Sequence, residues 1–151
     1  MPLPLWQSID DVLSFAIQQE RDFAKLYQAA AETLADATTA ALLHAFAKQE
    51  KVHRVRLEEL RGVHGMEVTT GDLAALHNQV NPDPPTISNS SLQAIVRYAV
   101  KAEADAETLY TWLADMSGDP DIRVVFRTLA QEEHEHAAWF KAEYKRQMRN
   151  T

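Results

Sequence analysis

The sequence has 151 residues, which is the size of one ordinary domain. Its formal net charge of −7 at pH 7 argues against nucleic acid or an anionic membrane surface as a partner, because both require a basic face. It contains no cysteine, which excludes disulfides, thiolate zinc sites, cysteine-ligated iron–sulfur clusters and a rubredoxin-type centre within this chain.

Two long helices are predicted in the first half of the chain. Ser8 is a good helix N-cap, and Asp11 lies at the position of a capping-box partner. Apolar residues then recur every three to four positions, which predicts a helix over about residues 8–35. Asp36 is a suitable N-cap for a second helix over about residues 37–62.

A different kind of segment follows the second helix. Gly62 and Gly65 can end that helix, and the run Pro82-Asp83-Pro84-Pro85 cannot continue any long helix. We therefore predict a crossover connection over residues 65–87, with one short helical turn around residues 72–77.

Two more long helices are predicted after the crossover. Ser88 or Ser90 is expected to cap a helix over about residues 89–117. The dipeptide Asp119-Pro120 combines an N-cap with a proline at the first helical position, and it predicts a fourth helix over about residues 119–148. Two short connections and one long one indicate an all-α fold, a single ferritin-like four-helix bundle in which two antiparallel helical hairpins are joined by the crossover.

An internal repeat relates the two halves of the chain. When the sequence is compared with itself at an offset of 83 residues, ten of the 40 positions from 14 to 53 are identical, against about three expected by chance. The repeated pairs include Glu20 with Glu103, Tyr27 with Tyr110, Glu50 with Glu133 and His53 with His136. The two halves therefore look like two copies of one helical hairpin.

The repeated polar residues have the spacing of metal ligands. Glu50 and His53 are three residues apart on one helix, so both side chains can point at one place, and the same holds for Glu133 and His136. Each predicted hairpin thus offers one lone glutamate and one Glu-x-x-His pair. A single Glu-x-x-His is usually part of a solvated helix face, and the prediction depends on both pairs having a partner glutamate in the same register.

A bundle of two such hairpins brings six ligands together at its centre. Di-iron carboxylate bundles use one glutamate from each of two helices and Glu-x-x-His from each of the other two. The mixture of carboxylates and imidazoles favours two ions of iron, with manganese or zinc as alternatives, over magnesium. The expected metal ligands are Glu20, Glu50, His53, Glu103, Glu133 and His136.

Other residues near these ligands have alternative interpretations. Tyr27 and Tyr110 either pack in the core, as inward-facing aromatic residues usually do, or donate a hydrogen bond to a ligand carboxylate. Glu107 lies one turn after Glu103 and is a candidate extra carboxylate. Asp22 and Asp105 repeat as well, but they lie about 200° around the helix from the lone glutamates and are expected to be solvated.

Four phrases of the sequence resemble the rubrerythrin family of ferritin-like proteins. AIQQERDFAKLY and AVKAEADAETLY are similar to its first and third helices, and FAKQEKVH and LAQEEHEH to its second and fourth. The resemblance extends over about residues 8–148 and includes all six core ligand positions of the family. It implies a ferritin-like di-iron domain.

Two features depart from the peroxide-reducing members of that family. Those enzymes usually carry a fused rubredoxin domain, whereas any electrons used by this cysteine-free chain must come from a separate protein. They also have an additional glutamate three residues after the third-helix ligand, and this chain has Ala106 there. Glu107 is adjacent to that position but is not equivalent to it.

The leading functional hypothesis is a di-iron oxidoreductase of peroxidase or ferroxidase type, which reacts with hydrogen peroxide or dioxygen in the defence against oxidative stress. The alternatives are iron storage or delivery without turnover, a manganese catalase-like enzyme, and a binding module with a vestigial site. By analogy with the family, a homodimer is expected. No apolar run approaches about 20 residues and the sequence MPLPLWQSIDDVL is unlike a signal peptide, so no membrane span is expected and the cytoplasm is the expected compartment.

Overall fold

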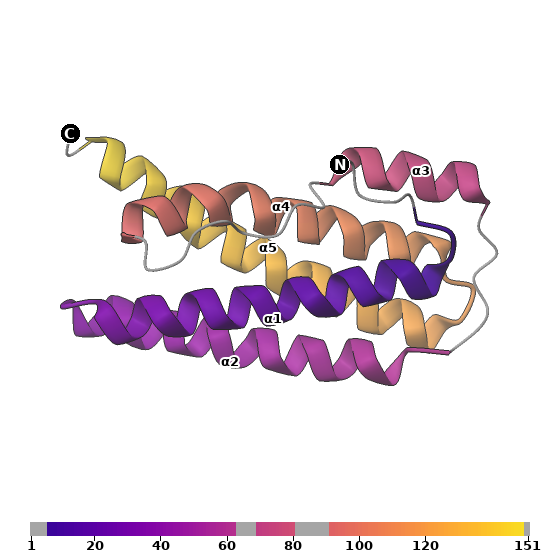
Figure 1. The fold of residues 1–151 in the computed structure, drawn as a ribbon, viewed down its shortest axis with the longest axis horizontal. Coiled ribbons are helices and arrows are strands. Elements are labelled where there is room, and N and C mark those ends of the chain that lie inside the picture. Colours follow the sequence, from indigo (N-terminus) through magenta and orange to yellow (C-terminus); the bar gives the residue numbers. More distant parts are fainter. Residues whose placement is uncertain (1–5, 63–68, 81–90, 150–151) are drawn as a thin grey trace.

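The computed structural model describes residues 6–62, 69–80 and 91–149. These residues contain four long helices and one short one, shown in Figure 1. The helices are α1 (Ile9–Thr33), α2 (Ala37–Glu59), α3 (Thr70–Gln79), α4 (Leu92–Met116) and α5 (Pro120–Arg149).

The long helices form two antiparallel hairpins. Helix α1 packs closely against α2, and α4 against α5, while the helix backbones of the two hairpins lie farther apart. In Figure 1, α2 ends at the opposite end of the bundle from the start of α4, so the connection between them must travel the length of the bundle. The expected all-α helical bundle is therefore confirmed.

The helix ends show why these segments begin where they do. The side chain of Ser8 accepts a hydrogen bond from the backbone N–H of Asp11, and that of Asp36 accepts one from Thr39. Helix α5 starts at Pro120, directly after Asp119, whose side chain accepts the backbone N–H of Asp121. These contacts satisfy donors that a helix start would otherwise leave unpaired.

The start of the third long helix differs from the expectation. Its N-cap is Ser91, whose side chain accepts the backbone N–H of Ala94. Neither Ser88 nor Ser90 has this role, and both lie outside the described residues. Serines close together in sequence have the same intrinsic tendency to cap a helix. Which one becomes the cap depends on where the first helical turn that packs against the core begins.

The crossover contains a longer helix than expected. The predicted turn at residues 72–77 is the ten-residue helix α3, which begins with a capping box between Thr69 and Asp72. Its buried Leu73 and Leu76 join the core. The His77 ring makes an edge-on contact with the Trp6 ring, with 4.9 Å between the ring centroids. Gly62 follows the end of α2 with a φ of 77°, which glycine adopts without strain; Gly65 lies outside the described residues.

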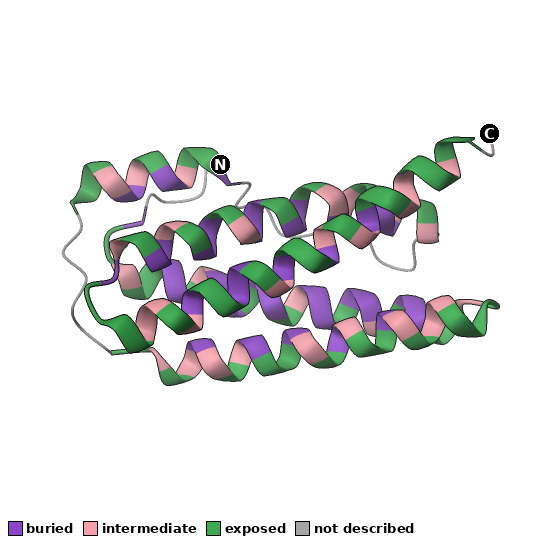
Figure 2. Cartoon of the chain, turned by 180° about the vertical axis from the view of Figure 1, so that it is seen from behind, coloured by how far each residue is buried: buried purple, intermediate pink, exposed green. Residues whose placement is uncertain are grey.

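Figure 2 shows that the buried positions of the long helices face one another along the bundle axis. Most of these positions hold aliphatic or aromatic side chains, but carboxylates and imidazoles interrupt them in the middle of the bundle. Among the described residues, no helix is both long enough and apolar enough to cross a membrane.

Candidate metal centre

The structure brings all six predicted ligands into one buried cluster. Glu20 comes from α1 and Glu103 from α4, while α2 and α5 each supply one Glu-x-x-His pair. Five of the six residues have an exposed fraction of 0%, and His136 has 1%. Six ionisable side chains this deeply buried are costly unless they are paired or coordinate metal.

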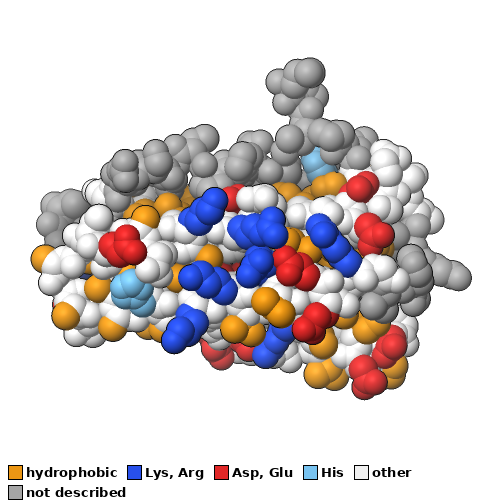
Figure 3. All heavy atoms as spheres, turned by 60° about the horizontal axis from the view of Figure 1, so that its bottom comes forward, with side chains coloured by type: hydrophobic (Ala, Val, Ile, Leu, Met, Phe, Trp, Pro, Cys, Tyr) orange, Lys and Arg blue, Asp and Glu red, His pale blue; other side chains and the backbone are white. Residues whose placement is uncertain are grey.

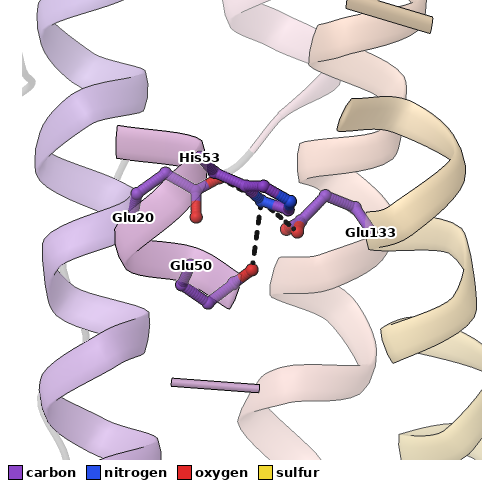
Figure 4. A group of neighbouring side chains, drawn as sticks. All are labelled: Glu20, Glu50, His53 and Glu133. Carbon is purple, nitrogen blue, oxygen red and sulfur yellow. Dashed lines mark ion pairs between the residues drawn. The ribbon is translucent and has the colours of Figure 1, made fainter. Parts of the chain in front are cut away.

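The cluster divides into two overlapping groups of four residues. Within each group, one ligand atom from every residue lies within 4.8 Å of the others. The first group is Glu20, Glu50, His53 and Glu133, drawn in Figure 4, and the second is Glu50, Glu103, Glu133 and His136. Glu50 and Glu133 belong to both groups, so the arrangement suits two ions with two shared carboxylates between them.

Each imidazole turns its Nδ1 atom toward the carboxylates. His53 Nδ1 lies 2.9 Å from Glu133 Oε1, 3.2 Å from Glu50 Oε1 and 3.6 Å from Glu20 Oε1. His136 Nδ1 lies 3.3 Å from Glu50 Oε1 and 3.5 Å from Glu133 Oε1. Glu103 Oε1 is 3.6 Å from the same nitrogen.

These short distances lack the angles of hydrogen bonds. Eight buried atoms of the cluster have no hydrogen-bond partner: both carboxylate oxygens of Glu50 and of Glu133, one each of Glu20 and Glu103, and Nδ1 of both histidines. Leaving such atoms unpaired is expensive, and a few isolated cases are the most that native proteins usually show. Because these eight atoms lie close together and are not paired with one another by hydrogen bonds, they fit metal cations.

The remaining oxygens of Glu20 and Glu103 are held by tyrosines from the opposite hairpin. The Tyr27 hydroxyl on α1 donates to Glu103 Oε1 at 2.7 Å, and the Tyr110 hydroxyl on α4 donates to Glu20 Oε1 at 2.5 Å. Both interpretations of these tyrosines therefore hold, because each ring lies in the hydrophobic core and each hydroxyl donates to a carboxylate of the cluster. Each tyrosine leaves one oxygen of its glutamate unpaired for an ion.

The outer nitrogens of the histidines contact two residues that the sequence did not single out. His53 Nε2 contacts the Glu132 carboxylate, and His136 Nε2 lies 2.7 Å from the side-chain oxygen of Gln49. Gln49 and Glu132 directly precede Glu50 and Glu133, so they are equivalent in the repeat. The register of the repeat could have identified them, although their difference in charge hid the equivalence.

The difference between Glu132 and Gln49 predicts unequal metal positions. A carboxylate on the outer N–H of a ligand histidine orients the ring and makes its other nitrogen a stronger donor than an amide does. We expect Glu132→Gln to weaken binding at the His53 position by about 10- to 100-fold, with Gln49→Glu strengthening the His136 position. Calorimetric titration with zinc, which is redox-inert, measures metal binding at both positions as two steps.

The matched control for this prediction is Glu135→Gln, an exposed position on α5 with the same change in charge. We expect its two binding steps to equal those of the wild type. If Glu132→Gln gave the same two steps as Glu135→Gln, the contact with His53 would have no role in metal affinity.

Two other carboxylates lie outside the cluster. Glu107 does not approach the ligands, and its oxygens lie 3.0 and 3.1 Å from Nδ1 of the exposed His134. Asp105 was expected to be solvated, but it is 6% exposed and pairs with Lys101 at 2.8 Å. The i, i+4 spacing to a lysine lets this aspartate turn inward with its charge compensated. Ala106 is fully buried.

Burial and mutual repulsion raise the pKa of three carboxyl groups in the metal-free cluster. Burial, followed by the charge of Glu133, raises the pKa of Glu20 from 4.5 to about 7. Burial and the neighbouring carboxylates also raise the pKa of Glu50 and of Glu103 well above 4.5. At neutral pH the metal-free cluster therefore retains protons on carboxyl groups that an ion would displace.

The pKa values of the two imidazoles are raised, whereas that of Glu133 between them is lowered. Burial by itself lowers the pKa of His136, but contacts with Glu103 and Glu133 outweigh it and raise the pKa to about 10. The pKa of His53 is likewise raised above 6.5, because its carboxylate contacts outweigh burial. Burial opposes ionisation of Glu133, yet the two imidazoles hold its pKa well below 4.5.

Comparisons with known proteins agree with this geometry. The family model described as Rubrerythrin matches residues 11–144, which confirms the resemblance drawn from the sequence. A solved structure of a hypothetical protein from Pyrococcus furiosus is similar to this chain with a TM-score of 0.69 and 22% identity, covering 92% of this chain and 89% of that one. That likeness shows the fold alone. No curated protein matches the sequence.

Proposed function

Because the chain belongs to the rubrerythrin family, we propose that its buried cluster binds two iron ions and that the loaded protein is an oxidoreductase acting on hydrogen peroxide or dioxygen. The observation that carries this proposal is the set of eight unpaired ligand atoms at the centre of the bundle. Four carboxylates balance the charge of two divalent ions, so the loaded site is close to neutral.

Each ligand has a distinct role in this proposal. Glu50 and Glu133 leave both oxygens unpaired and belong to both groups, so they would help to hold both ions. Glu20 with His53 completes one position, and Glu103 with His136 completes the other. The tyrosine bonds hold one oxygen of Glu20 and of Glu103, and the other oxygen of each glutamate would be available to an ion.

Two ferrous ions held there would supply the two electrons that, with two protons, convert hydrogen peroxide to two molecules of water. The chain's own contribution would be to hold the ions in a site that apolar side chains shield from solvent. Burial raises the pKa of the Tyr27 and Tyr110 hydroxyls well above 10.0, so both keep their protons at neutral pH and remain hydrogen-bond donors.

Repeated turnover requires a source of electrons outside these 151 residues. The sequence has no cysteine, so it contains no rubredoxin-type centre that could return electrons to the site. We propose that a separate electron-donor protein reduces the site between turnovers.

The proposal is tested by loading metal-free protein with ferrous iron under anaerobic conditions, desalting it, and following peroxide loss by stopped flow. We expect two irons per chain and peroxide reduction faster than that of free iron at the same concentration. Iron without faster peroxide or dioxygen reduction would reject the oxidoreductase. Many irons per chain would instead indicate storage, and activity with manganese alone would indicate a catalase-like enzyme.

A further inference from the structure

A cavity of about 330 Å³ lies on the outer side of α1 and α2. Helix α1 contributes residues one turn apart, and α2 contributes two residues from the turn that includes His53. The lining residues are Glu20, Arg21, Ala24, Lys25, Gln28, Lys51 and Arg54. The buried ligand Glu20 is one of them, so the cavity adjoins the Glu20–His53 half of the metal cluster.

The cavity carries an excess of positive charge in a chain whose net charge is −7. Arg21 and Arg54 share one carboxylate, Glu58, at 3.3 and 3.4 Å. Within the described ranges, no carboxylate oxygen lies within 4.0 Å of the Lys25 or Lys51 ammonium group. Figure 3 shows lysine and arginine side chains gathered on this face, over the middle of α1 and α2.

The repeat shows that neither the fold nor the ligand cluster requires these cations. At the offset of 83 residues, the four basic positions correspond to Ala104, Thr108, His134 and Ala137 on the opposite hairpin. That hairpin supports the same arrangement of glutamates, histidine and tyrosine without any of the four charges. The basic side chains are therefore available for a ligand that approaches from the α1–α2 side only.

We propose that this cavity binds a small anion through its carboxylate or phosphate oxygens, with Lys25 and Lys51 as the principal contacts. Its volume is within the range of small-molecule sites. Two unpaired ammonium groups and two partly neutralised guanidinium groups supply charge-assisted donors of the kind that such oxygens accept. This binding site depends on the surface of α1 and α2 and not on which metal occupies the cluster.

The test uses metal-free protein, so that an anion cannot bind through a metal ion. Inorganic phosphate and succinate, titrated separately by calorimetry and by amide chemical shifts, distinguish a phosphate from a carboxylate ligand. We expect saturable binding of at least one of them, with shifts centred on α1 and α2. The variant Lys25→Ala/Lys51→Ala should bind at least about tenfold more weakly, since charge-assisted contacts are lost.

The control variant is Lys141→Ala/Lys145→Ala, which removes two exposed lysines of α5 and changes the net charge equally. It should bind the anion as the wild type does. The proposal is overturned if neither anion binds saturably, or if both variants weaken binding equally, which would indicate only a general effect of net charge. Because no iron is present, either result leaves the di-iron proposal untouched.

Discussion

The variant Glu50→Ala/Glu133→Ala is expected to lose both metal ions, whereas Glu20→Ala should retain one. Glu50 and Glu133 belong to both ligand groups, so their removal leaves each position with only one glutamate and one histidine. Glu20 belongs to the first group alone, and the second group remains complete without it. After anaerobic loading and desalting, we expect two irons per chain in the wild type, none in Glu50→Ala/Glu133→Ala and one in Glu20→Ala.

The single variant Glu50→Ala should be more stable than the wild type when both are metal-free, whereas removing Glu133 would also remove the ionised partner of both imidazoles. Burial and neighbouring charge raise the pKa of Glu50 well above 4.5, which means that its ionised form is unfavourable in the fold. Replacing such groups by apolar ones removes that penalty, although the cavity left behind offsets part of the gain. Thermal unfolding of both metal-free proteins at pH 8 measures the difference.

Iron content and thermal unfolding together distinguish a metal site from a cluster that only stabilises the fold. A variant that lost iron but also unfolded would leave the cause of the loss ambiguous, and retention of the fold removes that ambiguity. Equal iron in Glu20→Ala and in the double variant would contradict the assignment of Glu50 and Glu133 as the shared ligands.

The second large effect is expected on the pH dependence of stability. The Glu20 carboxyl has a pKa of about 7 in the fold and about 4.5 when unfolded, so the folded chain binds more protons between these values. Its contribution to the free energy of unfolding, on the order of 3 kcal/mol, is fully present below pH 4.5 and is lost as the pH rises to 7. His136 has a pKa of about 10 in the fold and 6.5 when unfolded, so its contribution to stability is likewise lost as the pH rises between these values.

Metal-free protein should therefore have a melting temperature that falls as the pH rises from 5 to 8. Glu133 has the opposite sign, but its pKa is lowered, so its contribution is lost only below pH 4.5 and does not affect this range. A bound ion displaces the retained protons, and the stabilisation that it adds should grow with pH. Thermal unfolding with and without manganese at pH 5 and 8 tests both trends.

A flatter pH profile in metal-free Glu50→Ala/Glu133→Ala would assign the effect to the cluster. A melting temperature of the wild-type metal-free protein that rose from pH 5 to 8 would contradict the prediction, because protons would then be bound more tightly by the unfolded chain.

The six residues of the buried cluster could be predicted from sequence because a repeat marks them twice. Glu20 and Glu103, like His53 and His136, occupy one register in two copies of the hairpin, and helix geometry alone then places them on inward faces. The tyrosines were visible in the same register, but the sequence could not show that each one crosses to the other hairpin. That depends on how the hairpins pack.

The sequence was less informative wherever the two copies differ. Gln49 and Glu132 are not identical, so the comparison of the halves passed over them. Asp105 is identical to Asp22, yet only Asp105 is buried, because Lys101 compensates its charge. Lys25 and Lys51 belong to no repeated pattern, and a charged surface residue becomes informative only when the structure shows which cavity it lines.

The sharing of ligands between the hairpins has a mechanical consequence. Each ligand group takes three residues from one hairpin and one from the other, and the tyrosine bonds also cross between them. The helix backbones approach each other closely within each hairpin and lie farther apart between the hairpins, so side chains make the connection. Two bound ions would therefore join the two hairpins at the centre of the bundle, in addition to the aromatic contacts that already cross between them, such as that of Tyr27 with Phe140.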